Sequence, residues 1–259
     1  MTAEAVRLEH DGPLAILTLA APPLNLFDQA LIDALGDHVR TLAAAPPRGL
    51  LVRAEGRVVF GGVDVQLFDG LTVEQATALW TDLLALIHAV EELWLPTVFA
   101  AHALCLTGAF ELSLGCDLLL AAESARFGLV ETVVGLTPAM GGTQRLAERA
   151  GPARARELVM TGELYSAATL ERWGVVNRVL PDEGFADAAY AFAEKLATGP
   201  TKAHAATKAI VRAQIGGGAR AADAIVPEVA GGLFGTEDLK QAVQSFLTVG
   251  PGKATYEGK

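Results

Sequence analysis

Residues 104–142, LCLTGAFELSLGCDLLLAAESARFGLVETVVGLTPAMGG, are the stretch around which the rest of the chain is organised. The stretch holds a glycine-led helix start that carries Glu111, an apolar strand from Asp117 to Ala122, and Glu131 in a loop punctuated by glycines. Nearly all of its other residues are small or apolar, and burying an ionised carboxylate among such residues costs free energy. The two acids are therefore candidates for chemistry.

Each acid also has a plain structural interpretation. Glu111 follows Gly108 by three positions, where the helix dipole favours an acid in the first turn, and Glu131 could pair with Arg145 or Arg126. If Gly108 opens a helix, its N–H has no intrahelical partner and attracts an anion. Together, the two acids favour an acid/base pair, because burial and mutual repulsion raise one pKa and leave a proton donor beside an acceptor.

Composition excludes several classes of function. The 259-residue chain carries a net charge of −10 and has a pI near 5.0, which argues against nucleic acid as the main partner. The hydrophobic fraction is 51% and the mean hydropathy +0.35, yet no apolar run reaches the roughly 18 residues that suggest a membrane span. The N-terminus lacks a signal peptide's basic leader and apolar core. We expect a cytoplasmic protein without a membrane partner, and the apolar excess favours an oligomer.

Other reactive residue types form no recognisable site. Cys105 and Cys116 lie eleven positions apart in apolar surroundings, which indicates reduced structural thiols rather than a disulfide or a metal site. The five histidines share no metal-ligand spacing, and no serine lies in a nucleophile-elbow pattern. GGTQR at 141–145 lacks the Gly-Lys-Ser/Thr pattern of a phosphate loop. We therefore expect no metal.

The order of predicted elements is that of an α/β protein. Before residue 104 they are a hairpin within residues 5–20, a helix capped by Asp28, a strand at 49–55, a helix begun by a Thr72–Gln75 capping box, and a strand at 97–101. The second of these helices is expected to bury Val73, Ala76, Leu79, Trp80, Leu83 and Ile87. Alternating strands and helices predict an α/β fold.

Downstream, the pattern becomes entirely helical. Short helices are predicted across 142–161, Ser166 can cap another, and a strand is expected at 174–180. From Glu183 onward the periodicity is helical, with breaks at 199–200, 216–218 and 231–232. We place a boundary near residue 196, between an α/β core (1–196) and a helical C-terminal region (197–259) that is expected to pack against a neighbour.

Several motifs resemble those of the enoyl-CoA hydratase/isomerase (crotonase) family. FGLVE, VGLTPAMGGTQRL and TGELYSAATLERWGVVNRVLP resemble its signature, VVFGGVDV at 58–65 is similar to its first oxyanion loop, and residues 104–128 are similar to its second. The resemblance extends from PPLNLFD to FLTVGPGKATY. It implies a crotonase-like (ClpP/crotonase) superhelix of strand-strand-helix turns, with a C-terminal helical trimerisation region and a homotrimer or a dimer of trimers.

The resemblance also implies an activity and a site. The substrate would be an acyl-CoA thioester whose carbonyl accepts hydrogen bonds from the N–H groups of Val63 and Gly108. Gly61-Gly62 would expose the Val63 N–H, although a double glycine is more often only a turn. Glu111 would deprotonate the water that adds to a trans-2-enoyl-CoA, and Glu131 would deliver a proton to the α-carbon. The reverse assignment stays open, because a coupled pair shares its protons.

Further contacts follow from the resemblance, in which coenzyme A is carried by the substrate and the protein has no cofactor of its own. The substrate-binding residues it implies are Phe60, Gly62, Asp64, Gly135 and Lys253. Phe60 could narrow the acyl channel and Lys253 could meet a CoA phosphate, while Phe234 or Phe246 could line a fatty pocket or be structural. Thr107 and Ala109 replace family glycines beside Gly108, which predicts a tighter second oxyanion loop, and Gln66 replaces a CoA-contacting lysine.

Two alternatives to a hydratase remain. Family members that keep one of the acids, or neither, perform isomerisation, decarboxylation or thioester hydrolysis, so an isomerase or lyase acting on a specialised acyl-CoA is the second hypothesis. The third is a non-catalytic protein that binds acyl-CoA. Because both Glu111 and Glu131 are present, we expect a hydratase: a protein without turnover has no reason to keep two costly acids in an apolar site.

Overall fold

The computed structural model describes residues 4–259 and contains two β-sheets. The larger sheet has the order β1-β2-β3-β4-β6-β9, with β1 and β2 antiparallel and the other neighbours parallel. Its strands are β1 Val6–Asp11, β2 Leu14–Leu19, β3 Gly49–Ala54, β4 Thr97–Ala101, β6 Leu118–Ala122 and β9 Arg178–Leu180. The smaller sheet consists of β5 Cys105–Leu106, β7 Arg126–Gly128 and β8 Tyr165–Ser166. The predicted hairpin and α/β order are confirmed.

Helices alternate with the strands and then replace them. They are α1 Gln29–Ala44, η1 Val65–Phe68, α2 Val73–Glu92, α3 Thr107–Gly115, η2 Glu131–Val134, α4 Gly142–Ala150, α5 Pro152–Thr161, α6 Ala167–Arg172, α7 Phe185–Ala197, α8 Thr201–Gly232, η3 Leu233–Gly235 and α9 Glu237–Val249. The predicted caps are present: Asp28 accepts from the Leu31 N–H, and the Thr72–Gln75 capping box begins α2. Ser166 likewise caps α6.

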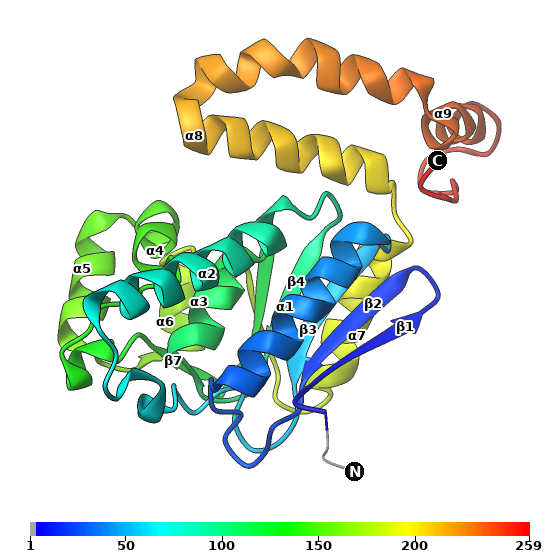
Figure 1. The fold of residues 1–259 in the computed structure, drawn as a ribbon. Helices are drawn as coiled ribbons and strands as arrows, with labels where there is room; N and C mark the ends of the chain where they lie inside the picture. The colour runs from blue at the N-terminus through cyan, green and yellow to red at the C-terminus, as the bar shows by residue number, and fades with distance from the viewer. Residues whose placement is uncertain (1–3) are drawn as a thin grey trace.

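Helices cover the large sheet, and its inner strands β2, β4 and β6 are almost entirely apolar and buried, as strands covered on both faces must be. The edge strand β1 carries exposed polar residues instead. All six residues of β2 are buried. α7 packs against β2, β3 and β4, and Figure 1 shows α1 in front of the sheet with α7 behind it. Gly49 permits this approach, because a Cβ there would lie 2.8 Å from the Cβ of Ala197.

The helix of the opening stretch is the most deeply enclosed. Each of the nine residues of α3 is buried, and the helix packs between α2, α4 and the strands β5, β6 and β7. A helix without a solvent face belongs in a core, which agrees with its apolar sequence. Any polar side chain that α3 carries must therefore find its partners inside the protein.

The C-terminal helices extend away from this body (Figure 1). α8 begins after the predicted break at 199–200 and bends back on itself at Gly218, whose φ of 74° and ψ of −178° are not helical. It ends at Gly232, so all three predicted breaks are confirmed. The placement of a domain boundary near residue 196 stays a prediction.

Two sequence predictions were wrong in detail. Val73 is 78% exposed, because it is the first residue of α2; the residues that α2 buries are Leu83, Ile87 and Val90. The strand expected at 174–180 is limited to β9, since the N–H groups of Val175 and Val176 turn back to the Leu170 carbonyl. Both valines are nevertheless buried.

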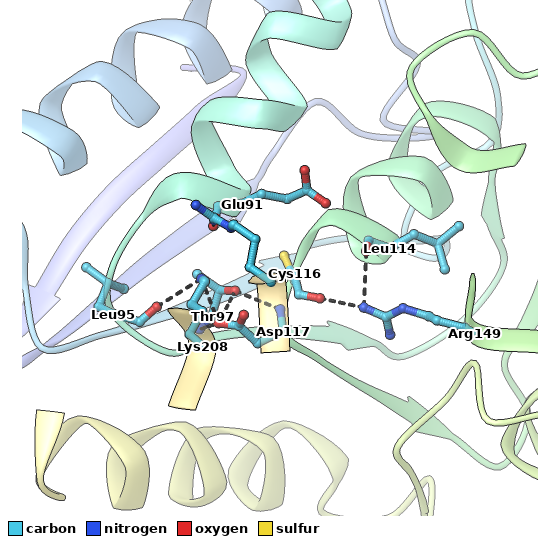
Figure 2. Close-up of polar contacts among 9 residues, drawn as sticks. Glu91, Leu95, Thr97, Leu114, Cys116, Asp117, Arg149 and Lys208 are labelled. Atoms are coloured by element: carbon cyan, nitrogen blue, oxygen red, sulfur yellow. Dashed lines mark hydrogen bonds and ion pairs between the residues drawn. The ribbon is translucent and has the colours of Figure 1, made fainter. Parts of the chain in front are cut away.

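A polar cluster ties α8 to the body of the protein (Figure 2). The Lys208 ammonium donates to Asp117 Oδ2 at 2.9 Å and to the Leu95 carbonyl at 3.3 Å. Asp117 Oδ2 also accepts from the N–H and the hydroxyl of Thr97, at 2.8 and 2.9 Å. In the same cluster Arg149 donates to the carbonyls of Leu114 and Cys116, where α3 ends. The side chains of Lys208 and Asp117 are 14% and 29% exposed, so water screens their attraction only partly.

The two cysteines are reduced structural thiols, as the sequence predicts. Cys105 and Cys116 are both buried and form no disulfide, and burial raises the pKa of each thiol. Over residues 4–259 there is no group of three or more His, Cys, Asp or Glu side chains placed to hold a metal ion. In the same range no helix is both long and apolar enough to traverse a membrane.

We expect Lys208→Met to lower the free energy of unfolding by about 1.5–3 kcal/mol, because it removes a charged donor from two partly buried oxygens. Urea denaturation followed by circular dichroism measures the change. The matched control is Lys240→Met, since Lys240 pairs with Glu237 at 2.8 Å on an exposed surface where the side chains are 56% and 60% exposed. That control should change stability by less than about 0.5 kcal/mol. Equal effects of the two substitutions would contradict an anchoring role for Lys208.

Candidate active site

Glu111 is the buried acid of α3, with 2% of its surface exposed. Its Oε2 accepts hydrogen bonds from the backbone N–H groups of Met140 at 2.9 Å and Gly142 at 2.7 Å. The carboxylate therefore lies at the start of α4, where backbone donors favour an anion. The interpretation of Glu111 as an acid that serves only the first turn of its own helix does not describe these contacts.

The turn that provides these donors is held from the other side by Arg145. Arg145 donates to the Gly141 carbonyl at 3.1 Å and forms an ion pair with Glu91 of α2, in which Nε and Oε1 are 2.6 Å apart. Gly141 has a φ of 97°, a conformation that favours glycine. Glu91 and Arg145 thus fix the position of the two N–H groups that face Glu111.

Glu131 begins η2 and is the second acid of the site. Its Oε2 is buried and has no hydrogen-bond partner within residues 4–259. The alternative of a pair with Arg145 or Arg126 is not found in the described part of the chain, because Arg145 is occupied by Glu91 and Arg126 forms no ion pair there. Such an orphaned acceptor is costly unless another molecule supplies a donor.

Both acids line one cavity of about 230 Å³. Three of the other predicted site residues, Gly62, Val63 and Gly108, line it as well. The remaining lining is mostly apolar. It comes from α1 and the residues before it, from the loop at 61–63, from η1, α2 and the start of α3, and from the segment 130–140: Phe27, Ile32, Gly61, Val65, Leu67, Phe68, Leu79, Trp80, Leu83, Thr107, Val130, Val133, Val134, Leu136, Thr137, Ala139 and Met140. An apolar cavity with a few convergent polar groups is typical of a small-molecule site.

Burial raises the pKa of both carboxyl groups. Desolvation brings the pKa of Glu111 to about 8, opposed by the Gly142 and Met140 N–H groups and reinforced by the neighbouring charge of Glu131. Desolvation likewise raises the pKa of Glu131 to about 7. The raised pKa values favour keeping a proton on at least one of the two acids near neutral pH, so the pair can offer a proton donor and an acceptor.

The hydrogen bonds indicate which acid carries the negative charge. Taken alone, the order of the two pKa values would leave the proton on Glu111. The contacts favour the opposite, because Glu111 Oε2 accepts from two fixed N–H groups whereas Glu131 Oε2 has no donor in the described chain. We assign the charge to Glu111 and the proton to Glu131 when the pair holds one proton, since two fixed N–H groups stabilise an ionised Oε2 more than a neutral one.

Two residues that line the same cavity, Val63 and Gly108, have backbone N–H groups with no hydrogen-bond acceptor recorded among residues 4–259. The Gly62 carbonyl and the Asp64 N–H both bond Phe27, at 3.0 and 3.2 Å, so the N–H of Val63 between them points away from Phe27. Gly108 is the second residue of α3, ahead of the first intrahelical hydrogen bond. These placements agree with the predicted exposure of both N–H groups.

Phe27 and Asn25 hold this region together, and sequence reasoning missed both. Phe27 bonds the first loop, and a Cβ on Gly108 would lie 3.4 Å from its ring, so Phe27 separates the two loops. The Asn25 amide donates to the carbonyls of Glu55, Val58 and Val59 at 2.8–3.2 Å. The only signal was the PPLN break at 22–25, which predicts a turn but not its partners.

Four predicted substrate-binding residues do not line the cavity. Phe60 is buried beneath it, edge-on to Phe27 with ring centroids 5.6 Å apart. Asp64 caps η1, Gly135 ends η2 with a φ of 76°, and Lys253 is exposed in the tail after α9. Their contacts with a substrate stay predictions.

Phe234 and Phe246 lie in the C-terminal region, 76% and 59% exposed, and not at the cavity. Phe246 instead lines a separate hollow that α9 forms with the tail after it. The suggested fatty pocket at these two residues therefore stays a prediction.

The raised pKa values of Glu111 and Glu131 predict a pH-dependent stability. The folded state keeps protons that the unfolded chain loses above its ordinary pKa of 4.5, so the free energy of unfolding falls as the pH rises from about 5 and levels off above the folded values of about 7 and 8. In the variant Glu111→Gln the side chain at this position cannot ionise. Relative to the wild type it should gain more than about 1 kcal/mol of stability between about pH 5 and about pH 8, measured by urea denaturation.

Glu157→Gln is the control for this comparison, because Glu157 lies on the exposed face of α5 and its carboxyl meets water in both states. Its stability difference from the wild type should not vary with pH. A Glu111→Gln difference that is equally constant would show that the carboxyl is not destabilised by burial.

Comparison with known proteins places this site among relatives. The family described as enoyl-CoA hydratase/isomerase matches residues 9–258. A protein of Rhizobium meliloti named "Probable enoyl-CoA hydratase" is 30% identical over 249 residues, which cover 95% of this chain and 96% of that protein. A "Carnitinyl-CoA dehydratase" of Salmonella enteritidis is 32% identical over 211 residues, or 81% of each chain.

A solved structure agrees with these sequence matches. The enoyl-CoA hydratase from Bacillus anthracis superposes with a TM-score of 0.90 at 27% identity, over 98% of this chain and all of the other. The crotonase-like fold expected from the sequence motifs is thereby confirmed. The chain belongs to the enoyl-CoA hydratase/isomerase family.

Proposed function

We propose that this protein is an enoyl-CoA hydratase, which adds water across the double bond of a trans-2-enoyl-CoA thioester. The observation that carries the proposal is the pairing of Glu111 and Glu131 in one apolar cavity, where burial raises the pKa of both. A hydration needs one base for the water and one acid for the carbon, and both must work near neutral pH. Relatives named hydratase and dehydratase support the same reaction class.

In the proposed reaction Glu111 is the base and Glu131 the acid. The water transfers a proton to the ionised Glu111 while its oxygen bonds to the third carbon of the acyl chain. The electron pair of the double bond moves toward the thioester carbonyl, and the protonated Glu131 then delivers its proton to the second carbon. Water is added without change of redox state, and proton exchange with solvent resets the two acids.

The charge that develops on the thioester oxygen would be met by the N–H groups of Val63 and Gly108. Neither needs to reorganise, because Phe27 and the packing of α3 hold both in place. A donor of this kind typically contributes a factor of about 10²–10³ in rate. No cofactor is required for this chemistry, and coenzyme A arrives with the substrate.

The acyl group would lie against the apolar lining contributed by Leu79, Trp80, Leu83 and Phe68. These side chains favour a hydrocarbon chain, although they do not define its length. We also propose that α8 and α9 form a subunit interface, supported by apolar side chains that they leave exposed: Val211, Ile215, Val243, Phe246, Leu247 and Val249.

The test is hydration of crotonyl-CoA, followed by the loss of enoyl-thioester absorbance and by mass spectrometry of the product. We expect Glu111→Gln and Glu131→Gln each to lower kcat by about 10²–10⁴, because each removes one proton-transfer group. Glu157→Gln should leave kcat unchanged, since this side chain is exposed on α5. Hydration that survives both active-site substitutions would contradict the mechanism.

The product mass separates the two other hypotheses. Hydration adds the mass of one water, whereas an isomerase leaves the mass of the thioester unchanged. Tight binding of a panel of acyl-CoA thioesters without turnover would instead support a non-catalytic binding protein.

A further prediction concerns Gly142, whose N–H group holds the carboxylate of Glu111. A Cβ added at Gly142 would lie 2.6 Å from Glu111 Cγ and 2.9 Å from its Oε2, so Gly142→Ala must displace the carboxyl group. We expect kcat to fall by about 100-fold, since a displacement of about 1 Å at the reacting groups costs that much. Steady-state kinetics measures the loss.

Gly216→Ala is the matched control, because a Cβ at this helical glycine of α8 meets no atom within 4 Å. It should leave kcat unchanged and preserve or raise stability. A Gly142→Ala enzyme with full activity would show that the position of Glu111 does not matter for turnover.

A further inference from the structure

We propose that the Thr107 hydroxyl holds the reacting water, by donating a hydrogen bond to the oxygen that becomes bonded to the third carbon of the acyl chain. This inference rests on the proposed hydration and deepens it, because it adds a third group to the two acids. It is carried by the backbone of Thr107, by the surroundings of its hydroxyl and by the donors and acceptors in the cavity.

The backbone of Thr107 has an unfavourable conformation. Among residues 4–259 only Thr107 and Asn25 combine a side chain with a positive φ, at 46° and 49°. Asparagine tolerates this region, and the Asn25 side chain forms several hydrogen bonds there, but a β-branched residue is a genuine outlier. Strain of this kind clusters at functional sites, where the side chain has a use.

The hydroxyl of Thr107 has no partner inside the protein. Thr107 is 4% exposed, and its Oγ1 is buried without a hydrogen bond to any described residue. The residue lines the same cavity as Glu111 and Glu131. Because no described residue satisfies this hydroxyl, the remaining source of a partner is a molecule bound in the cavity that Thr107 lines.

The other polar groups of the cavity identify that molecule. Carboxyl groups that accept hydrogen bonds take the protons of a water, and its lone pairs need a donor. Thr107 is the first residue of α3 and Glu111 the fifth, and both residues line the cavity. With one lone pair directed at the third carbon, the other can accept from Thr107 Oγ1.

The thioester carbonyl is a less suitable partner for this hydroxyl. A carbonyl oxygen has two lone pairs, and the N–H groups of Val63 and Gly108 supply two donors to it in the proposed complex. The oxygen at the third carbon has no backbone donor assigned to it. In the proposed complex the Thr107 hydroxyl therefore supplies the hydrogen-bond donor that the oxygen at the third carbon lacks.

The test compares the affinities of thioesters that differ only in this oxygen. Calorimetry measures the dissociation constants of 3-hydroxybutyryl-CoA and butyryl-CoA, and of the corresponding eight-carbon pair. Thr107→Val removes the hydroxyl and keeps the branched shape. We expect it to weaken binding of the 3-hydroxy thioesters about tenfold and to change binding of the unsubstituted ones less than about twofold.

Three companion variants make the result specific. Thr107→Ser should restore most of the preference for the 3-hydroxy thioester, because it keeps the donor. Thr107→Gly should lose the preference while raising Tm by a few degrees, since glycine adopts a positive φ without strain. Thr161→Val, on α5 where the hydroxyl bonds its own helix at Glu157, should alter neither affinity.

Catalysis gives an independent readout. If the wild type hydrates crotonyl-CoA, Thr107→Val should lower kcat about 10–100-fold with a smaller change in KM, because the lost contact is to the water and not to the thioester. A wild type without hydration would refute the proposed function, while the binding comparison would still decide the role of Thr107.

Specific results would overturn the inference. One is that Thr107→Val weakens the binding of both members of a thioester pair equally, which would place the contact of Thr107 elsewhere on the substrate. The other is an unchanged preference in Thr107→Val and Thr107→Gly. A wild type that binds none of the four thioesters would refute this inference and the proposed function together.

Discussion

The site depends on one interaction, the acceptance of two backbone hydrogen bonds by Glu111 Oε2. α3 has no exposed residue, so this carboxyl cannot reach bulk water and must be satisfied where it lies. Its donors, the N–H groups of Met140 and Gly142, belong to a turn that the Glu91–Arg145 ion pair fixes from the side of α2. The position of one buried charge therefore requires α2, α3 and α4 to pack in a single arrangement, which is why the chain encloses α3 so completely.

A second part of the cavity lining is organised by Phe27 rather than by a charged residue. The backbone of Phe27 bonds the residues on both sides of Val63 and its ring lies close to Gly108, so Phe27 sets the separation of the N–H groups of Val63 and Gly108. The loop that carries Val63 is held further by the Phe60 N–H, which bonds the Leu104 carbonyl. In the proposed reaction these main-chain donors must be fixed in this way, because they cannot adjust to a substrate as a flexible side chain can.

Local signals in the sequence predicted most elements and drew attention to the two buried acids. Glu111 and Glu131 could be found because charged residues stand out within an apolar stretch, whereas the roles expected of Val63 and Gly108 came from the family resemblance. The partners of those residues could not be found. Glu91 and Arg145 are 54 positions apart, and periodicity says that a helix face is covered without saying by what. For that reason Leu79 and Trp80, which the sequence places in the core, line the cavity instead. Val73, the first residue of α2, is exposed.

Several features that lower the stability of the fold belong to residues that line the cavity. Within residues 4–259 four buried side-chain polar atoms lack a partner, and two of them belong to Thr107 and Glu131, which line the cavity. A chain selected for stability alone would replace both, since glycine relieves the backbone at Thr107 and an apolar side chain would suit the site of Glu131 better. Both residues line the same cavity, so a molecule bound there could supply the missing hydrogen bonds. The protein in its free form is then less stable than its fold allows, and a ligand that supplies those hydrogen bonds should stabilise it.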